Sequence, residues 1–362
     1  MKIKVLISSL LLVCIWGCEE EVIDPIDPAD PDPIDLCDVN QNQQQITSMT
    51  NDVTSIVQEV EGSLSFQLLN EYLNIEDAEV MNEDWVESMI EGLNNTINFE
   101  DQINNNNLFD FEANQGVYEW NNNTNTFDLS SNSNNIQISF PSSPTSIINN
   151  AIFTLSGYND DNVFIDGENF FLPTYVNANL TVDGIEIFSL VSSISYDDPI
   201  PTSINTTIYV NPMTIQIQGQ QVTPFNFEAQ INIQTNNQAD INFYANVLLN
   251  SDDYENLEGN NIENISTNLS VGDMTFNAFM NCNLIDFDDD VSTETINNAT
   301  NVDVTNNGSV IANLELIELE NGDYDVSIVH CDGTTESSEI YYEPFIQDVE
   351  DILYPYMGDW LD

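Results

Sequence analysis

From Leu108 onward, apolar and polar side chains alternate with a period of two residues, and this alternation returns many times along the chain. Successive side chains of a β-strand point to opposite faces, so each run predicts a strand with one apolar and one polar face. The clearest runs lie at 136–140, 176–182, 225–233, 239–247, 265–271 and 274–278. So many runs predict a large sheet that has one apolar side.

Short polar turns, rather than long helices, separate these runs. Asp183–Gly184 is the strongest hairpin signal, because both residue types tolerate the positive φ angles of a tight turn. Short connections favour antiparallel pairing. The runs therefore predict a wide, strongly curved antiparallel meander, to which 310–319, 324–330 and 339–342 add further strands.

Residues 41–98 follow a different period, in which apolar side chains recur every three or four residues, as at Ile46, Met49 and Val53. This spacing is typical of amphipathic helices. Gly62 and the stretch 74–83 divide the region into two or three helices. A similar stripe near the C-terminus predicts a last helix with Phe345, Val349, Ile352, Leu353 and Tyr356 on one side.

The chain begins with Lys2 and Lys4, followed by an apolar run at 5–13 that is too short to span a bilayer. The run leads into the motif IWGC, which ends at Cys18 and resembles the lipobox of bacterial lipoproteins. In that family the peptide is cut before the cysteine, which becomes the acylated first residue. The resemblance implies that Cys18 carries a lipid anchor.

Three acidic residues, Glu19–Glu21, directly follow Cys18. They are similar to the export signal that sends many Bacteroidetes lipoproteins to the outer face of the outer membrane; an ordinary acidic linker is the alternative. Residues 23–34 then repeat Pro and Asp, a composition that cannot pack and that favours an extended stalk. The resemblance implies a lipid-anchored protein at the cell surface.

Segments of the body also resemble uncharacterised flavobacterial lipoproteins. These segments are 116–121 (GVYEWN), 136–141 (IQISFP), 149–151 (NNA) and 172–184 (LPTYVNANLTVDG). No activity is known for that family, so the resemblance implies no functional residues.

We therefore expect an α+β fold, with N-terminal helices packed on a large curved antiparallel β-sheet and a short C-terminal helix. The expected parts of the chain are a signal peptide at 1–17, the lipidated cysteine with its acidic linker at 18–39, a helical segment at 40–107, and an antiparallel β domain with the C-terminal helix at 108–362.

The chain holds 62 Asp and Glu against 2 Lys and Arg, which gives a formal net charge of −60. Both lysines lie in the expected signal peptide, so the mature body would have no Lys or Arg. Nucleic acid binding requires such cations to neutralise phosphates and is therefore excluded. Attachment to a membrane is expected through the acyl chains alone. Whether the lack of cations is functional or reflects compositional drift stays open.

Once Cys14 is removed with the signal peptide and Cys18 is acylated, the body retains Cys37, Cys282 and Cys331. An odd number is a poor framework for disulfides. A Cys282–Cys331 bridge in an oxidising envelope and buried free thiols are the two open alternatives.

His330 is the only histidine, so any histidine-dependent mechanism would have to use it. Its neighbour Cys331 points to the opposite face of a strand, so the two cannot act together as base and nucleophile. His330 shares a face with Val326 and Ile328, which favours a packed histidine. Because 62 carboxylates pair by chance, they identify no glycosidase pair either. No catalytic residue is predicted, and the protein is not expected to be an enzyme.

Calcium is the one cofactor that the sequence suggests, since acidic side chains stand at closely spaced positions in two places. The two candidate sets are Asp286, Asp288, Asp290 and Glu294, and Asp160, Asp161, Asn162 and Asp166. The first set begins like an EF-hand loop, but Val291 and Asn297 replace the Gly and Glu that such a loop needs. A looser calcium site is the hypothesis, and a solvated acidic loop is the alternative.

We expect a non-catalytic surface lipoprotein that acts as a binding or accessory module for a glycan or a protein partner. The polar strand faces offer amides together with Tyr244, Tyr209 and Trp120, and sugar recognition uses amides and aromatic rings. A merely hydrated sheet face is the alternative. Two other functions stay open: a half-barrel carrier of lipid or another hydrophobic ligand, and a carboxylate-based glycan hydrolase.

Overall fold

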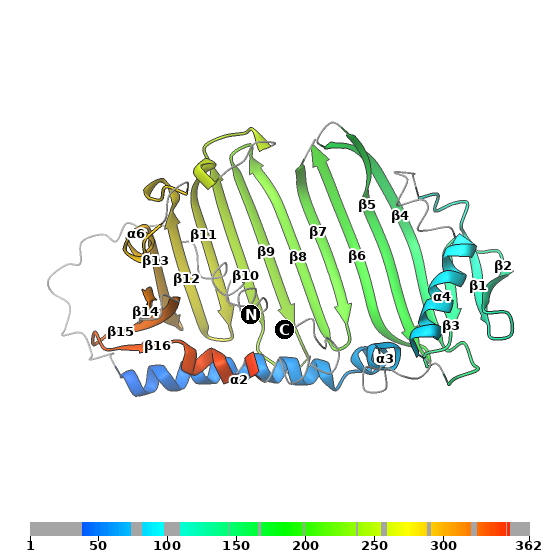
Figure 1. Ribbon diagram of the computed structural model, residues 1–362, viewed down its shortest axis with the longest axis horizontal. Coiled ribbons are helices and arrows are strands. Elements are labelled where there is room, and N and C mark those ends of the chain that lie inside the picture. Colours follow the sequence, from blue (N-terminus) through cyan, green and yellow to red (C-terminus); the bar gives the residue numbers. More distant parts are fainter. Residues whose placement is uncertain are drawn as a thin grey trace.

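The computed structural model describes residues 38–73, 82–97 and 109–347, with short gaps at 144, 166–167, 198–199, 237, 255–258, 288–290, 320–323 and 345. Cys18 and the expected signal peptide and stalk lie outside this range. The described residues form one sheet of 16 strands with helices at its ends (Figure 1). The fold is α+β, as the sequence predicts.

The main helices are α2 (Val39–Glu61), α3 (Leu64–Leu73), α4 (Asn82–Ile97) and α6 (Thr293–Ala299). The strands are β1 (Gly116–Asn121), β2 (Thr126–Ser131), β3 (Ile136–Phe140), β4 (Ala151–Ile165), β5 (Glu168–Val182), β6 (Ile185–Asp197), β7 (Ile200–Val210), β8 (Met213–Thr223), β9 (Asn226–Gln234), β10 (Ile241–Leu249), β11 (Ile262–Val271), β12 (Met274–Asn281), β13 (Thr300–Asn306), β14 (Ser309–Glu318), β15 (Tyr324–His330) and β16 (Thr335–Ser337).

The strands follow one another in the sheet as they do in the chain from β3 to β16, and each pairs antiparallel with its neighbours. At the other end, β1 lies between β3 and β2 and pairs with β3 in parallel. The predicted meander is confirmed.

Two-residue turns set the register of the long hairpins. Asp183 and Gly184 have φ angles of 52° and 79°, and they join β5 to β6 with Val182 opposite Ile185. Asn307 and Gly308 have φ angles of 49° and 80° and join β13 to β14 in the same way. Gly and Asn or Asp are the residues that accept this left-handed backbone.

A packed hydrophobic core lies at the β1 end of the sheet, where α4 covers β1–β3. Its buried side chains are Phe109, Tyr118, Trp120, Phe127, Ile136 and Ile138, and Met89 and Leu93 of α4 pack against them. A Cβ atom at Gly92 would lie 3.1 Å from the Trp120 ring, so the glycine allows α4 to approach closely.

The opposite end of the sheet has a second core, against which α2 packs. Ile46 of α2 is buried with Met274, Val304, Ile311, Ala312 and Ile328. A smaller cluster beside it holds Met280, Cys282, Ile285 and Ala299. In Figure 1, α2 runs across one set of strand ends, below the sheet.

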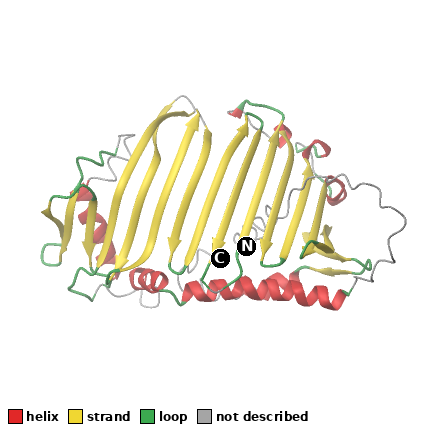
Figure 2. Ribbon diagram, turned by 180° about the vertical axis from the view of Figure 1, so that it is seen from behind, coloured by secondary structure: helices red, strands yellow, loops and turns green. Residues whose placement is uncertain are grey.

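The middle of the sheet is built differently. Figures 1 and 2 show its two sides, and no described helix covers β7–β10 on either one. Within β7, β8 and β9 no described apolar side chain is fully buried. The middle is therefore a single layer held between two packed ends.

The strand predicted at 339–342 is wrong, because these residues are helical. The last strand is β16 instead, and Ser337 Oγ accepts a hydrogen bond from the backbone N–H of Glu339 at 3.0 Å. A serine hydroxyl in this position favours the start of a helix. The described helical segment ends at residue 347, so most of the predicted C-terminal helix lies outside the described range.

Among the described helices, none is both long enough and apolar enough to cross a membrane.

Candidate functional site

The strand register gathers uncharged polar side chains into rows on one face of the central sheet. In the first row, residues in direct register across six strands are Asn205, Gln218, Gln230, Tyr244, Asn268 and Asn277. In the second row they are Thr207, Gln216, Asn232, Asn242, Ser270 and Thr275. We call these two rows the amide face.

The amide face is uncharged in a chain that is extremely acidic. Across the whole of β7–β12, only Glu228 and Glu263 carry a carboxylate, and neither belongs to the two rows. Glu228 stands on the same face in the next row, opposite Gln220 and Asn246. The formal net charge of the chain is −60. The acidic side chains therefore lie almost entirely outside these six strands.

Neighbouring amides on this face bond to one another across the strands. Asn268 Nδ2 donates to Asn277 Oδ1 at 2.7 Å, and Asn232 donates to Asn242. Each amide has two N–H donors and a carbonyl acceptor with two lone pairs. Such cross-strand bonds use only part of this capacity, so the face can still donate to and accept from a ligand.

Tyr244 lies inside the first row, between Gln230 and Asn268, and 36% of it is exposed. Its ring offers a stacking surface among the amides. Tyr209 is on the same face but half-buried, and its hydroxyl accepts a hydrogen bond from Asn211 Nδ2 at 2.9 Å.

The expectation that Trp120 belongs to this face is wrong. Trp120 is only 4% exposed, and it packs in the core at the β1 end with its ring 5.1 Å from that of Phe127. Its position follows from the alternation of β1, which places it on the same side as buried Tyr118.

The opposite face of the same strands is apolar and half-buried. One row in direct register is Ile208, Ile215, Ile233 and Ile241, and the next contains Ile217, Ile231 and Phe243. The central strands therefore have a polar side with a single carboxylate, Glu228, and a half-exposed apolar side.

A second polar cluster surrounds the buried His330, and its carboxylate, Glu336, is partly exposed. His330 is 3% exposed, and its Nε2 lies 2.8 Å from Glu336 Oε1. Tyr341 donates to the same oxygen at 2.6 Å, and Gln43 donates to Glu336 Oε2 at 2.7 Å. The prediction of a packed histidine is confirmed, and its carboxylate partner comes from across the β15–β16 turn.

Two effects act on the pKa of Glu336. Burial alone would raise it, but the hydrogen bonds from Tyr341, His330 and Gln43 outweigh burial and hold the pKa below its ordinary value. Burial, together with the Glu336 carboxylate, raises the pKa of Tyr341. The cluster thus keeps one carboxylate charged and joins α2 to the last hairpin.

The first predicted calcium set is only partly described. Asp286 and Glu294 are exposed, while Asp288 and Asp290 lie outside the described residues. No group of three metal-ligating acids, histidines or cysteines occurs in the described part of the chain. This calcium site stays a prediction.

The second predicted calcium set does not converge. Asp160 and Asp161 are successive residues of β4, paired with Pro173 and Leu172, so their side chains point to opposite faces. Burial raises the pKa of Asp160, and burial with the nearby Asp160 raises the pKa of Tyr158 to about 12. Asp160 therefore belongs with Tyr158, and Asp166 lies outside the described residues.

Cys282 is a buried free thiol, and burial raises its pKa to about 11. The possible Cys282–Cys331 bridge is therefore not formed, and Cys331 is bonded elsewhere.

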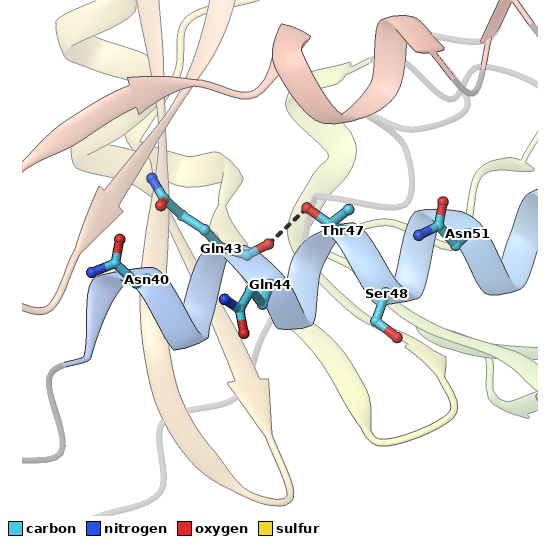
Figure 3. A pocket seen from close by; sticks show the side chains of 6 residues that line it. All are labelled: Asn40, Gln43, Gln44, Thr47, Ser48 and Asn51. Atoms are coloured by element: carbon cyan, nitrogen blue, oxygen red, sulfur yellow. Dashed lines mark hydrogen bonds between the residues drawn. The ribbon is translucent and has the colours of Figure 1, made fainter.

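A shallow depression of about 340 Å³ lies on α2 (Figure 3). Its lining residues are all uncharged and polar: Asn40, Gln43, Gln44, Thr47, Ser48 and Asn51. Gln43 is already bound to Glu336, and Thr47 donates to the Gln43 carbonyl at 2.8 Å. One face of a single helix cannot surround a ligand, so the amide face is the stronger candidate.

No protein-family model, curated protein or solved structure matches this chain. The proposed function therefore depends on the geometry of the described residues and on the sequence patterns.

Proposed function

We propose that this protein is a non-catalytic lipoprotein, anchored at the cell surface through acylated Cys18, whose amide face binds an uncharged glycan. The observation that carries the proposal is the pair of uncharged polar rows across β7–β12, with Glu228 as the one carboxylate beside them on that face, in a chain of formal charge −60. The lipobox at Cys18 and the resemblance of body segments to flavobacterial lipoproteins further support the proposal.

The chemistry of the face favours a ligand rich in hydroxyl groups. A hydroxyl both donates and accepts hydrogen bonds, and so does an amide side chain. The exposed ring of Tyr244 adds an apolar surface on which a sugar ring can stack. An anionic polymer would be repelled by the rest of the body, whereas a neutral one would not. A protein partner with uncharged polar groups is the alternative occupant of this face.

The test is binding of the intact body to a panel of insoluble neutral polysaccharides, compared with anionic ones. Gln230→Glu places a charge in the first row without changing the side-chain length, and it should weaken binding at least about tenfold, about 1.4 kcal/mol. Gln44→Glu is the matched control, since Gln44 is exposed on α2. Equal binding by both variants, or binding to none of the neutral polysaccharides, would remove the glycan proposal.

A carrier of hydrophobic ligands is the second candidate, because the apolar rows of the central strands are half-exposed. An acyl chain laid across Ile217, Ile231 and Phe243 would bury that surface. The two candidates use opposite faces of the same strands. Binding of a fluorescent fatty acid that Ile231→Asn abolishes and Gln230→Glu leaves intact would favour the carrier.

A glycan hydrolase needs two carboxylates flanking a cleft. In β7–β12 the two carboxylates lie on opposite faces: Glu228 is on the polar face, hydrogen-bonded to Gln220 at 2.8 Å, and Glu263 is on the other face. We therefore propose recognition without cleavage, and release of reducing ends from a bound glycan would contradict it.

A further inference from the structure

Cys331 directly follows β15 and is disulfide-bonded. Its partner is not Cys282, which is a free thiol. The remaining cysteines are Cys14, Cys18 and Cys37, and all three precede the described residues. These three cysteines differ in how far they stand in the sequence from Asp38, the residue that caps the start of α2.

The first turn of α2 docks on the sheet beside Cys331. Asn42 Nδ2 donates to the backbone oxygen of Ile311 at 3.0 Å and lies 3.6 Å from Cys331 Sγ. The backbone N–H of Asn42 donates to the carbonyl of Asp38 at 2.9 Å, so Asp38 is one helical turn away. One turn rises about 5.4 Å, so the start of α2 lies near Cys331.

Cys37 directly precedes Asp38, whose carboxylate accepts from the backbone N–H of Gln41 at 3.1 Å and caps the helix. Cys14 and Cys18 lie beyond the Pro- and Asp-rich stretch 23–34. We propose that Cys37 and Cys331 form a disulfide that fastens the end of the stalk to the β15–β16 end of the sheet. Excluding Cys18 also rests on the anchor in the proposed function, whereas the choice of Cys37 rests on its position next to Asp38 in the sequence.

The bond forms by thiol–disulfide exchange with an oxidised protein disulfide of the cell envelope. The Cys37 and Cys331 thiols lose two protons and two electrons as their S–S bond forms, and the electrons reduce the donor disulfide to a dithiol. Cys282 does not compete, because it is 2% exposed and burial keeps it protonated.

This disulfide would determine where a pull on the stalk enters the body. Figure 1 places the start of α2 beside β15 and β16, at one end of the long axis, with β1 and β2 at the other. Force on residue 37 would pass covalently into the sheet at Cys331, rather than through the hydrogen bonds of Asn42 and Gln43 alone. The β16 end would face the membrane, and the amide face would extend away from it.

Peptide mapping of the mature protein tests the bond directly. The protein is isolated from the outer membrane, denatured without reductant, alkylated, and cleaved at Glu and aromatic residues because trypsin has no sites in the body. We expect a linked pair of peptides containing Cys37 and Cys331, with Cys282 as the only alkylated thiol. Alkylated Cys331, a bridge to Cys282, or a link to a second chain would overturn the proposal.

Thermal melting of serine variants gives a second measurement. Cys37→Ser and Cys331→Ser should each lower the Tm by about 5 °C, and the double variant should melt no lower than either single one. Additive effects would contradict a shared bond. Where a variant fails to fold, the mapping of the natural protein decides. The intact mass reports acylation of Cys18 separately, so failure of the anchor and failure of the disulfide are distinguishable.

Discussion

The two ends of the sheet and its middle are made of similar strands but are stabilised differently. At the ends, side chains of α4 and α2 pack against the sheet, and side chains such as Phe127 and Val304 are almost completely buried. In the middle, β7–β9 have no fully buried apolar side chain among the described residues. The packed ends therefore hold a thin central sheet in place and leave both of its faces accessible.

This difference explains why the middle is the better place for recognition. A core needs to exclude water from both layers, whereas a binding surface needs exposed groups on a rigid support. The central strands are paired with neighbouring strands on both sides, and the side chains of their polar rows are exposed or half-buried. Acidic residues, which would repel an anionic ligand, are nearly absent from these strands.

The largest expected effect compares the same substitution in the two regions. Phe127→Ala removes a ring that is 6% exposed in the core at the β1 end, and it should cost about 3–5 kcal/mol of the free energy of unfolding. Phe243→Ala removes a half-buried ring in the middle, where water already reaches the site, and it should cost about 1–2 kcal/mol. Denaturant unfolding measures both. Equal losses would show that the middle is packed like the ends.

Ionic strength should have a smaller but clear effect. The Debye length falls from about 30 Å at 0.01 M to about 8 Å at 0.15 M, so added salt screens the repulsion among the 62 acids. We expect the Tm to rise by several degrees over this range. Sodium chloride and magnesium chloride at matched ionic strength separate screening from binding of divalent ions, and a Tm that salt does not change would contradict the repulsion.

The smallest expected effect concerns the Glu336 cluster at the β16 end. Because folding lowers the pKa of Glu336, its contribution to stability is complete above its ordinary pKa and is lost as the pH falls through the lowered value. The natural protein should therefore have a larger free energy of unfolding than Glu336→Gln at pH 7. This difference should shrink below about pH 4, where glutamate ordinarily titrates. A difference that grows on acidification would contradict a lowered pKa for Glu336 in the folded protein.

Much of the fold could be predicted because local patterns determine it. Alternation located eight of the 16 strands, and Asp183–Gly184 located the hairpin between β5 and β6. The eight are β3, β5, β9, β10, β11, β12, β14 and β15. The pairing of His330 with Glu336 depends on the turn between β15 and β16, where Asp332–Gly333 is a hairpin signal that could have revealed it. The strand expected at 339–342 failed because four residues are too few to separate alternation from a helix beginning at Ser337.

The candidate site could be predicted only in part. The amide-rich strands and Tyr244 were visible in the sequence, but the rows exist only through the register between strands. Trp120 was misplaced because the alternation within β1 was not used: Tyr118 and Trp120 are two residues apart and therefore share the buried face. How far the helices extend over the sheet depends on tertiary packing, and no local pattern encodes it.

Hydrogen exchange with and without a bound neutral polysaccharide tests the central claim most directly. The proposal predicts slower exchange in peptides from β7–β12 and unchanged exchange in α4, β1–β3 and β14–β16. Protection confined to either packed end, or no change anywhere under conditions where the polysaccharide is bound, would contradict recognition by the amide face.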